Sequence, residues 1–147
     1  MTTVNERRDR ASVPVHLIAA ALALTGAGLI AAGVAVPWFS LFAGLQPVSA
    51  MGSTNGTILL VAAAASASIG IAAAVADRPL WRRLLLAAGI GLVAFSAYLV
   101  VQLLSTFREV SADPLMVAQL GPGLGLVVIG ALAITAASFL GDARASR

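Results

Sequence analysis

The polar residues best placed to do chemistry in this sequence fall on one stripe of a predicted helix. Tyr98, Gln102, Ser105 and Glu109 follow one another at steps of four, three and four residues, a spacing that puts side chains on one helical face. The stripe begins in an apolar segment and ends at a carboxylate. We expect it to face other helices, a water-filled recess or a partner, because polar groups facing lipid are costly. The alternative is a polar helix end that only meets lipid headgroups.

A second set of candidate residues lies in the uncharged segment from Pro37 to Gly56. Its first half is rich in apolar and aromatic residues, which we expect to form a short helix lying in the headgroup region. The alternative is that Trp38 anchors the chain at the membrane interface and a plain connector follows. The second half supplies neutral hydrogen-bonding side chains, Gln46 and Asn55 among them.

Together, the stripe and the loop predict a shallow pocket that opens on the outer side of a membrane. It would hold a neutral or amphiphilic molecule, or a helix of another protein. The residues predicted to form this surface are Trp38, Phe42, Gln46, Asn55, Tyr98, Gln102 and Glu109.

No arrangement typical of an enzyme or of a metal site is visible in the sequence. There is no cysteine, and the single histidine, His16, has no carboxylate neighbour to complete a metal site. No nucleophile is paired with a base. Gly121, Gly123 and Gly125 are not followed by the lysine of a phosphate-binding loop. We therefore expect no enzymatic activity, no metal and no cofactor.

The composition is that of an integral membrane protein. Of 147 residues, 60% are apolar and 10% charged, whereas a soluble domain has roughly 45–50% apolar and about 25% charged residues. Such a chain cannot cover the surface of a soluble domain, and it is too apolar to be disordered. The nine basic residues are all Arg and are divided among tails and loops. Because they form no basic face, we expect no nucleic-acid binding.

Four apolar segments are each long enough to cross a bilayer, which takes about 20 residues in a helix. They cover residues 15–36, 57–76, 84–104 and 122–140, between tails at 1–12 and 141–147. The helix of the third segment is expected to continue toward Val110. Before the fourth, Asp113 and Pro114 predict a short helix that Gly121 ends. The sequence therefore predicts one all-α membrane domain over residues 1–147, an up-down-up-down bundle of four transmembrane helices.

The arginines predict the orientation of this bundle. Eight of the nine lie in the N-terminal tail, the loop between spans two and three, and the C-terminal tail, and only Arg108 lies on the other side. The positive-inside rule then places both termini in the cytoplasm and the protein in the cell membrane. The alternative, that the first span is a cleaved signal peptide, is disfavoured because its apolar run exceeds the roughly 7–15 residues typical of one.

Small residues repeat along three of the four spans and predict close helix packing. Heptad-spaced glycines mark the first span at Gly26 and Gly33 and the fourth at Gly123 and Gly130, which favours left-handed packing. The second span has small residues on two faces, so we expect it at the centre of the bundle. These faces are Ala62, Ser66, Gly70 and Ala74, and Ala64, Ser68, Ala72 and Ala76. The alternative is a general enrichment in Ala and Gly.

Each predicted span also contains at least one hydroxyl. We expect most of these hydroxyls to bond to the carbonyl one turn earlier, and the alternative is a polar network or a solute path. The residues concerned are Thr25, Ser66, Ser68, Ser96 and Thr135.

Several short motifs carry a family likeness. They are Pro37-Trp38-Phe39-Ser40, Asn55-Gly56 at the start of span two, the Arg-rich inner turn, and Gly121-Pro122-Gly123-Leu124-Gly125-Leu126 at the start of span four. This order resembles small four-span membrane proteins of actinobacteria, including tryptophan-operon-associated and similar uncharacterised ones. The resemblance implies the topology and a bacterial source, and it implies no activity. The first loop also resembles that of claudins, but their paired cysteines are missing.

Two functions follow from these observations. The leading expectation is a non-catalytic membrane subunit or accessory factor. It would pack in the bilayer against a partner membrane protein, or a second copy, through small-residue faces, and present a polar and aromatic surface outside. The alternative is a binder or carrier of a lipid-like or small apolar solute in an outward-facing cavity of the bundle.

Overall fold

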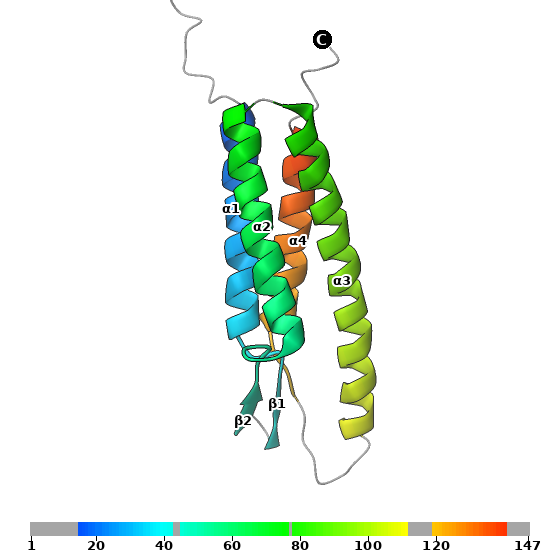
Figure 1. The fold of residues 1–147 in the computed structure, drawn as a ribbon. Helices are drawn as coiled ribbons and strands as arrows, with labels where there is room; N and C mark the ends of the chain where they lie inside the picture. Colours follow the sequence, from blue (N-terminus) through cyan, green and yellow to red (C-terminus); the bar gives the residue numbers. More distant parts are fainter. Residues whose placement is uncertain (1–14, 43–44, 77, 112–118, 141–147) are drawn as a thin grey trace, which may run out of the picture.

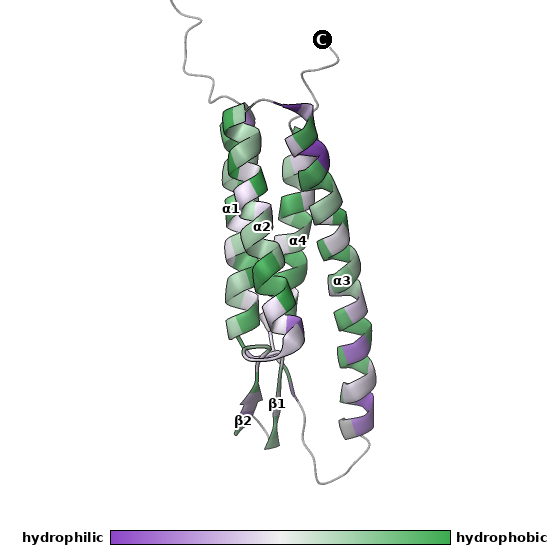
Figure 2. Ribbon diagram, in the orientation of Figure 1, coloured by the Kyte–Doolittle hydropathy of each residue, from purple (hydrophilic) through white to green (hydrophobic). Residues whose placement is uncertain are grey.

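The computed structural model describes residues 15–42, 45–76, 78–111 and 119–140. It contains four helices, each long and apolar enough to cross a membrane, and they lie side by side (Figure 1). Figure 2 shows hydrophobic residues along all four helices and hydrophilic ones gathered toward their ends. These features indicate a multi-pass membrane protein. The helices are α1 (Val15–Ala35), α2 (Thr54–Ala76), α3 (Pro79–Ser111) and α4 (Gly123–Leu140).

Local sequence signals set where the helices begin and end. Helix α1 ends before Pro37, because a proline disfavours helical backbone at the residue before it. Helix α2 is capped by Ser53, whose Oγ accepts a hydrogen bond from the amide of Gly56 at 3.0 Å. Helix α3 begins at Pro79, a residue whose fixed φ suits the first helical position.

The most extensive helix pair is α1 with α4, and glycines make their close approach possible. A Cβ atom on Gly26 would lie 2.6 Å from the carbonyl oxygen of Gly130, and one on Gly33 would lie 2.6 Å from that of Gly123. As residue numbers rise along α1 they fall along α4 at these contacts, so the two helices are antiparallel. Around these contacts Ile30 and Ile134 are fully buried.

The structure corrects the predicted place of span two. Helix α2 has 22% of its span buried, the smallest share of the four, whereas α4 has 44%. One small-residue face is used, since a Cβ on Gly70 would lie 2.8 Å from that of Ala23 on α1. The other face is exposed at Ala64 and Ser68. The α1–α4 pair is therefore the centre of the bundle, and helix α2 lies at its side. The prediction was wrong because small residues permit a neighbouring helix to approach closely but do not require one.

A small sheet replaces the helix predicted after Pro37. It consists of β1 (Phe39–Leu41), β2 (Gln46–Val48) and β3 (Gln119–Leu120), in the antiparallel order β2-β1-β3. The hairpin turns at Phe42, whose φ is 54°. Phe39 is paired with both Val48 and Leu120, so ladder hydrogen bonds outweigh helix formation in this short segment.

Trp38 and Gly121 join this sheet to the bundle. Trp38 is only 8% exposed and its Nε1 donates to the Gly33 carbonyl oxygen at 2.8 Å, so it is not an anchor in the lipid interface. The Gly121 amide donates to the Trp38 carbonyl oxygen at 2.8 Å. Gly121 therefore follows a strand and does not end a short helix as predicted. Asp113 and Pro114 lie outside the described residues.

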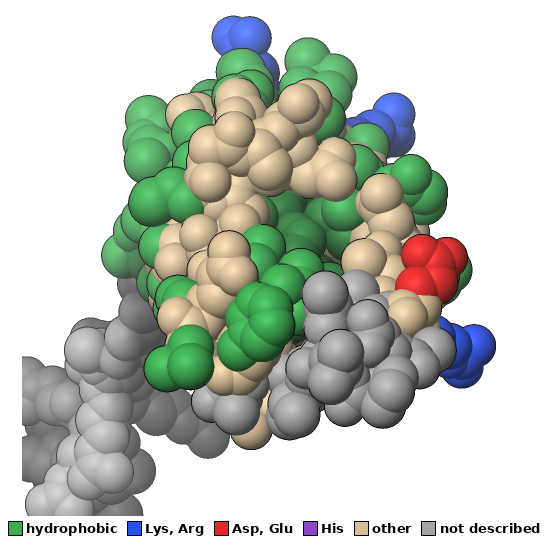
Figure 3. All heavy atoms as spheres, turned by 90° about the horizontal axis from the view of Figure 1, so that it is seen from below, with side chains coloured by type: hydrophobic (Ala, Val, Ile, Leu, Met, Phe, Trp, Pro, Cys, Tyr) green, Lys and Arg blue, Asp and Glu red, His purple; other side chains and the backbone are tan. Residues whose placement is uncertain are grey.

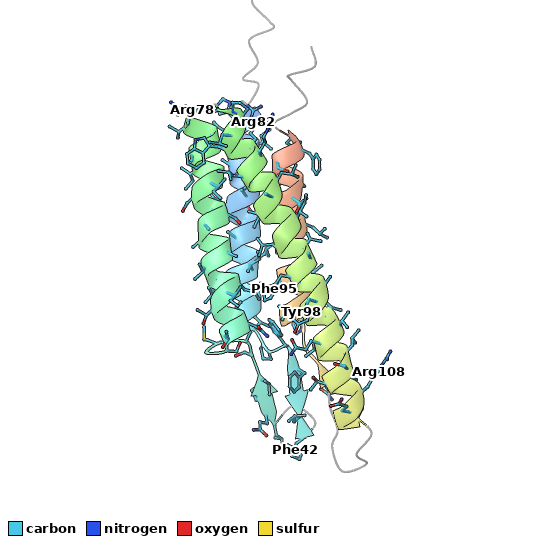
Figure 4. All side chains as sticks on the ribbon, turned by 45° about the vertical axis from the view of Figure 1, so that its right-hand side comes forward. Phe42, Arg78, Arg82, Phe95, Tyr98 and Arg108 are labelled. Carbon is cyan, nitrogen blue, oxygen red and sulfur yellow. The ribbon has the colours of Figure 1, made fainter. Side chains whose placement is uncertain are left out.

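Helix α3 is longer than a bilayer requires. Its 33 residues span about 50 Å, against about 30 Å of hydrocarbon. Its first half packs on α4, where a Cβ on Gly89 would lie 2.7 Å from Thr135 Oγ1. Its second half diverges from α4 toward the end that carries the hairpin (Figure 1). Figure 4 shows Arg78 and Arg82 at one end of the bundle and Phe42 and Arg108 at the other.

The glycine contacts predict a difference between two substitutions on α1. Gly26→Ala should lower the free energy of unfolding by about 1–3 kcal/mol, because the added methyl overpacks the α1–α4 contact. Gly28→Ala is the matched control, since a Cβ there meets nothing within 4 Å, and it should be neutral or stabilising by up to about 1 kcal/mol. Thermal unfolding in detergent measures both, and equal effects would contradict the packing described.

Candidate functional site

A cavity at the hairpin end of the bundle brings together three of the predicted site residues. Its volume is about 140 Å³. Trp38 contributes from the residue before β1, Asn55 from the first turn of α2, and Gln102 from the half of α3 nearer the hairpin. The remaining lining residues are Phe39, Leu99, Leu103 and Thr106. We call this the polar cavity.

The other four predicted residues do not line the polar cavity. Phe42 and Gln46 are exposed on the hairpin, with Phe42 at its tip (Figure 4). Tyr98 is 58% exposed and stacks on Phe95, with 6.3 Å between the ring centroids. Glu109 is exposed about two turns beyond Gln102. Of the four residues of the predicted stripe, only Gln102 therefore lines the polar cavity.

The bundle-facing side of α3 explains this offset. Leu92, Ser96 and Leu99 are buried and Leu103 is half-buried, at alternating steps of four and three residues. This is the heptad seam that packs helices together, and it places Tyr98 and Glu109 on another side. Leu99 and Leu103 escaped the sequence-based prediction because it followed polarity, and Thr106 escaped it because that residue lies off the predicted stripe. The seven-residue repeat of the seam would have found all three.

Two side-chain amides at the polar cavity have no hydrogen-bond partner among the described residues: those of Asn55 and Gln102. The other polar groups there are satisfied, since Trp38 Nε1 donates to Gly33 and Thr106 Oγ1 donates to the Gln102 carbonyl oxygen at 3.1 Å. Each amide offers two donors and an acceptor. No charged side chain is among the lining residues described. The arrangement suits a neutral group that both donates and accepts hydrogen bonds, held beside an aromatic wall.

A second cavity lies on the other flank of α3, between its C-terminal half and α4. It has a volume of about 210 Å³ and only aliphatic side chains and glycine line it, so we call it the apolar cavity. Leu103 lines both cavities. Figure 3, a view from the hairpin end, shows a hollow with hydrophobic side chains at its floor. The lining residues are Val100, Leu103, Leu104, Leu120, Gly121, Leu124, Gly125 and Val128.

The hydroxyls that the sequence analysis singled out on the four helices fall into two groups. Thr25, Ser68 and Thr135 donate to the carbonyl oxygen four residues earlier, at 2.8–2.9 Å, which confirms the expectation for them. Ser66 and Ser96 are buried and their Oγ atoms have no hydrogen-bond partner. These two hydroxyls do not line either cavity.

The remaining candidates can be placed briefly. His16 is exposed at the start of α1, and the described residues contain no group of three His, Asp or Glu that could hold a metal ion. Comparison of the chain with protein-family models, with curated proteins and with solved structures found no match. The resemblance to small actinobacterial membrane proteins stays a prediction, and the function is argued from the geometry.

The buried hydroxyl of Ser66 predicts different consequences for substitutions at two serines on α2. Ser66→Ala should raise the free energy of unfolding by about 1 kcal/mol, because it removes a buried polar group that makes no hydrogen bond. Ser68→Ala is the control, since Ser68 is exposed and bonded to Ala64, and its effect should be within about 0.5 kcal/mol. A destabilised Ser66→Ala protein in thermal unfolding would show that the hydroxyl has a partner in the membrane.

Proposed function

We propose that this protein is a non-catalytic, multi-pass protein of the bacterial cell membrane that binds a neutral amphiphilic molecule at its outer end. The observation that carries the proposal is the pair of unpartnered amides, Asn55 and Gln102, at the mouth of the polar cavity. Buried or half-buried polar groups are normally hydrogen-bonded. Asn55 is half-buried and Gln102 is exposed. Two amides that converge on one cavity with aromatic and aliphatic walls are typical of a ligand site.

The proposal includes an orientation in which the helices cross alternately up and down, with both termini in the cytoplasm. Its support is the charge distribution: Arg78, Arg82 and Arg83 lie where α2 gives way to α3, at the end of the bundle away from the hairpin (Figure 4). Arginine in short loops favours the cytoplasmic side. The hairpin and both cavities then lie on the outer side.

The cavities then lie at the outer boundary of the hydrocarbon. Gly123, the first residue of α4, lies beside Gly33 near the end of α1, so both helices reach the boundary together. On α3, Gly89 lies opposite Thr135, and twelve residues separate Thr135 from Gly123. Counting the same distance along α3 places the boundary near Val101. The part of α3 from Gln102 outward therefore projects about 15 Å into the headgroup layer and beyond.

The orientation predicts which introduced thiols can be labelled from outside. The chain has no cysteine, so each variant carries a single thiol. Leu45→Cys, at a hairpin residue that is 86% exposed, should react with a membrane-impermeant maleimide in intact cells. Ser146→Cys, near the C-terminus, should react only after the membrane is permeabilised. The reverse pattern would overturn the orientation and place the cavities on the cytoplasmic side.

The proposed binding site predicts that the side-chain amide of Gln102 contributes to ligand retention and that of Gln46 does not. Gln102→Leu should weaken ligand retention roughly tenfold, because losing a hydrogen bond to the ligand costs about 1.4 kcal/mol. Gln46→Leu is the matched control, since Gln46 is exposed on β2 and does not line the cavity. Native mass spectrometry of protein released from lipid nanodiscs measures the bound fraction. Equal retention by the two variants would contradict the site.

A second function, an accessory subunit for another membrane protein, is favoured by the small-residue surface that the bundle leaves free. Ala64, Ser68 and Ala76 are exposed on α2, and a Cβ on Gly91 of α3 would meet nothing within 4 Å. Such surfaces allow a partner helix to approach closely. Native mass spectrometry of protein purified in mild detergent separates the two functions, because an accessory subunit would carry a stoichiometric protein partner.

A further inference from the structure

We infer that the ligand is a neutral single-chain lipid whose polar end occupies the polar cavity and whose alkyl chain occupies the apolar cavity between α3 and α4. This inference rests on the proposed function and adds the class of ligand and a second binding site. It begins from the chemistry of the two cavities, which differ although they flank the same helix. The polar cavity offers two free amides, and the apolar cavity offers only aliphatic side chains and glycine backbone.

The walls of the apolar cavity favour an alkyl chain. Val100, Leu104, Leu124 and Val128 present branched aliphatic groups, and Gly125 leaves space between them, since a Cβ there would meet nothing within 4 Å. An empty cavity forfeits the dispersion contacts of its walls. This cavity opens at the surface, where Leu104, Leu120 and Gly125 are exposed, so a chain from the surrounding lipid can enter it. An alkyl chain restores those contacts, and the bilayer supplies such chains at this depth.

The two cavities flank the same helix and share one lining residue. Leu103 lines both of them, and it is half-buried on the seam of α3. Gln102, on the polar side, lies at the hydrocarbon boundary, and Val128, on the apolar side, lies more than one turn inside the start of α4 at Gly123. A lipid with its head at the boundary and its tail inside would pass Leu103 in its ordinary membrane orientation.

The polar cavity favours a head without charge. No Arg, Asp or Glu is among the described residues that line it, so the lining offers no ion partner to a charged head. Asn55 and Gln102 each donate and accept hydrogen bonds. Hydroxyl groups and an ester carbonyl, as in a monoacylglycerol, complement both functions of these amides.

Trp38 is a natural reporter for the experiment because it lines the polar cavity and is shielded from bulk lipid. The only other tryptophan is Trp81, at the other end of α3, and Trp81→Phe removes its signal. The protein is placed in phosphatidylcholine nanodiscs and titrated with a long-chain monoacylglycerol brominated on its chain, which quenches nearby tryptophan fluorescence. Brominated phosphatidylcholine gives the background quenching by bulk lipid.

Two further variants test the alkyl site directly. Gly125→Leu should fill the apolar cavity and weaken binding of the long-chain monoacylglycerol at least about tenfold. Gly91→Leu is the matched control, because Gly91 lies on α3 with open space around it and lines neither cavity. Binding of a short-chain monoacylglycerol, followed by competition, should be unchanged in Gly125→Leu, and this also shows that the variant is folded.

The outcomes separate the inference from the proposed function. Saturable quenching of Trp38 that Gly125→Leu weakens and Gly91→Leu does not is the result expected. Equal saturable binding in these two variants, with loss in Gln102→Leu, would overturn the alkyl site and leave the proposed function standing. Quenching no stronger than that of brominated phosphatidylcholine would overturn the neutral-lipid ligand, and retention of a different molecule in the mass spectra would then uphold the polar cavity alone.

Discussion

The contact between α1 and α4 is the constraint on which the rest of the structure depends. In a bilayer there is little hydrophobic force between helices, so packing must hold them together. Four glycines provide it, because Gly26 meets Gly130 and Gly33 meets Gly123 with no room for a side chain. The same contact places Trp38 just beyond Gly33, where its indole donates to the Gly33 carbonyl oxygen. The hairpin and the strand before α4 are thereby fixed to the end of the central pair.

Helix α3 is attached to this centre over only part of its length. Its inner half is held at Gly89, which lies against Thr135, whereas its outer half is flanked by a polar and an apolar cavity that share Leu103. Both cavities open at the surface, where Gln102, Leu104 and Leu120 are exposed, so a molecule from the surrounding membrane can enter them. The excess length of α3, its divergence from α4 (Figure 1) and the free amides at Asn55 and Gln102 all lie at this one end.

The sequence predicted the helices well because twenty-residue apolar segments and prolines at their ends are local signals. It also singled out the four glycines that meet between α1 and α4, but not which helices they join. It placed span two at the centre because small residues show where contact is allowed and not where it occurs. The sheet escaped prediction because Phe39 is paired with Leu120, a residue far along the chain. Within the site, Trp38, Asn55 and Gln102 were predicted from polarity and aromaticity, and Leu103 was not, because its role depends on both cavities.

Nuclear Overhauser contacts between a bound monoacylglycerol and the protein would show directly whether one lipid occupies both cavities. In nanodiscs, we expect contacts from the glycerol protons to the side-chain amide protons of both Asn55 and Gln102. In the same complex we expect contacts from the alkyl protons to the methyl groups of Leu103 and Val128. If alkyl contacts occurred only at lipid-facing residues such as Val61 and Val75, which are exposed on α2, the claim of a lipid held at the outer end of α3 would be contradicted.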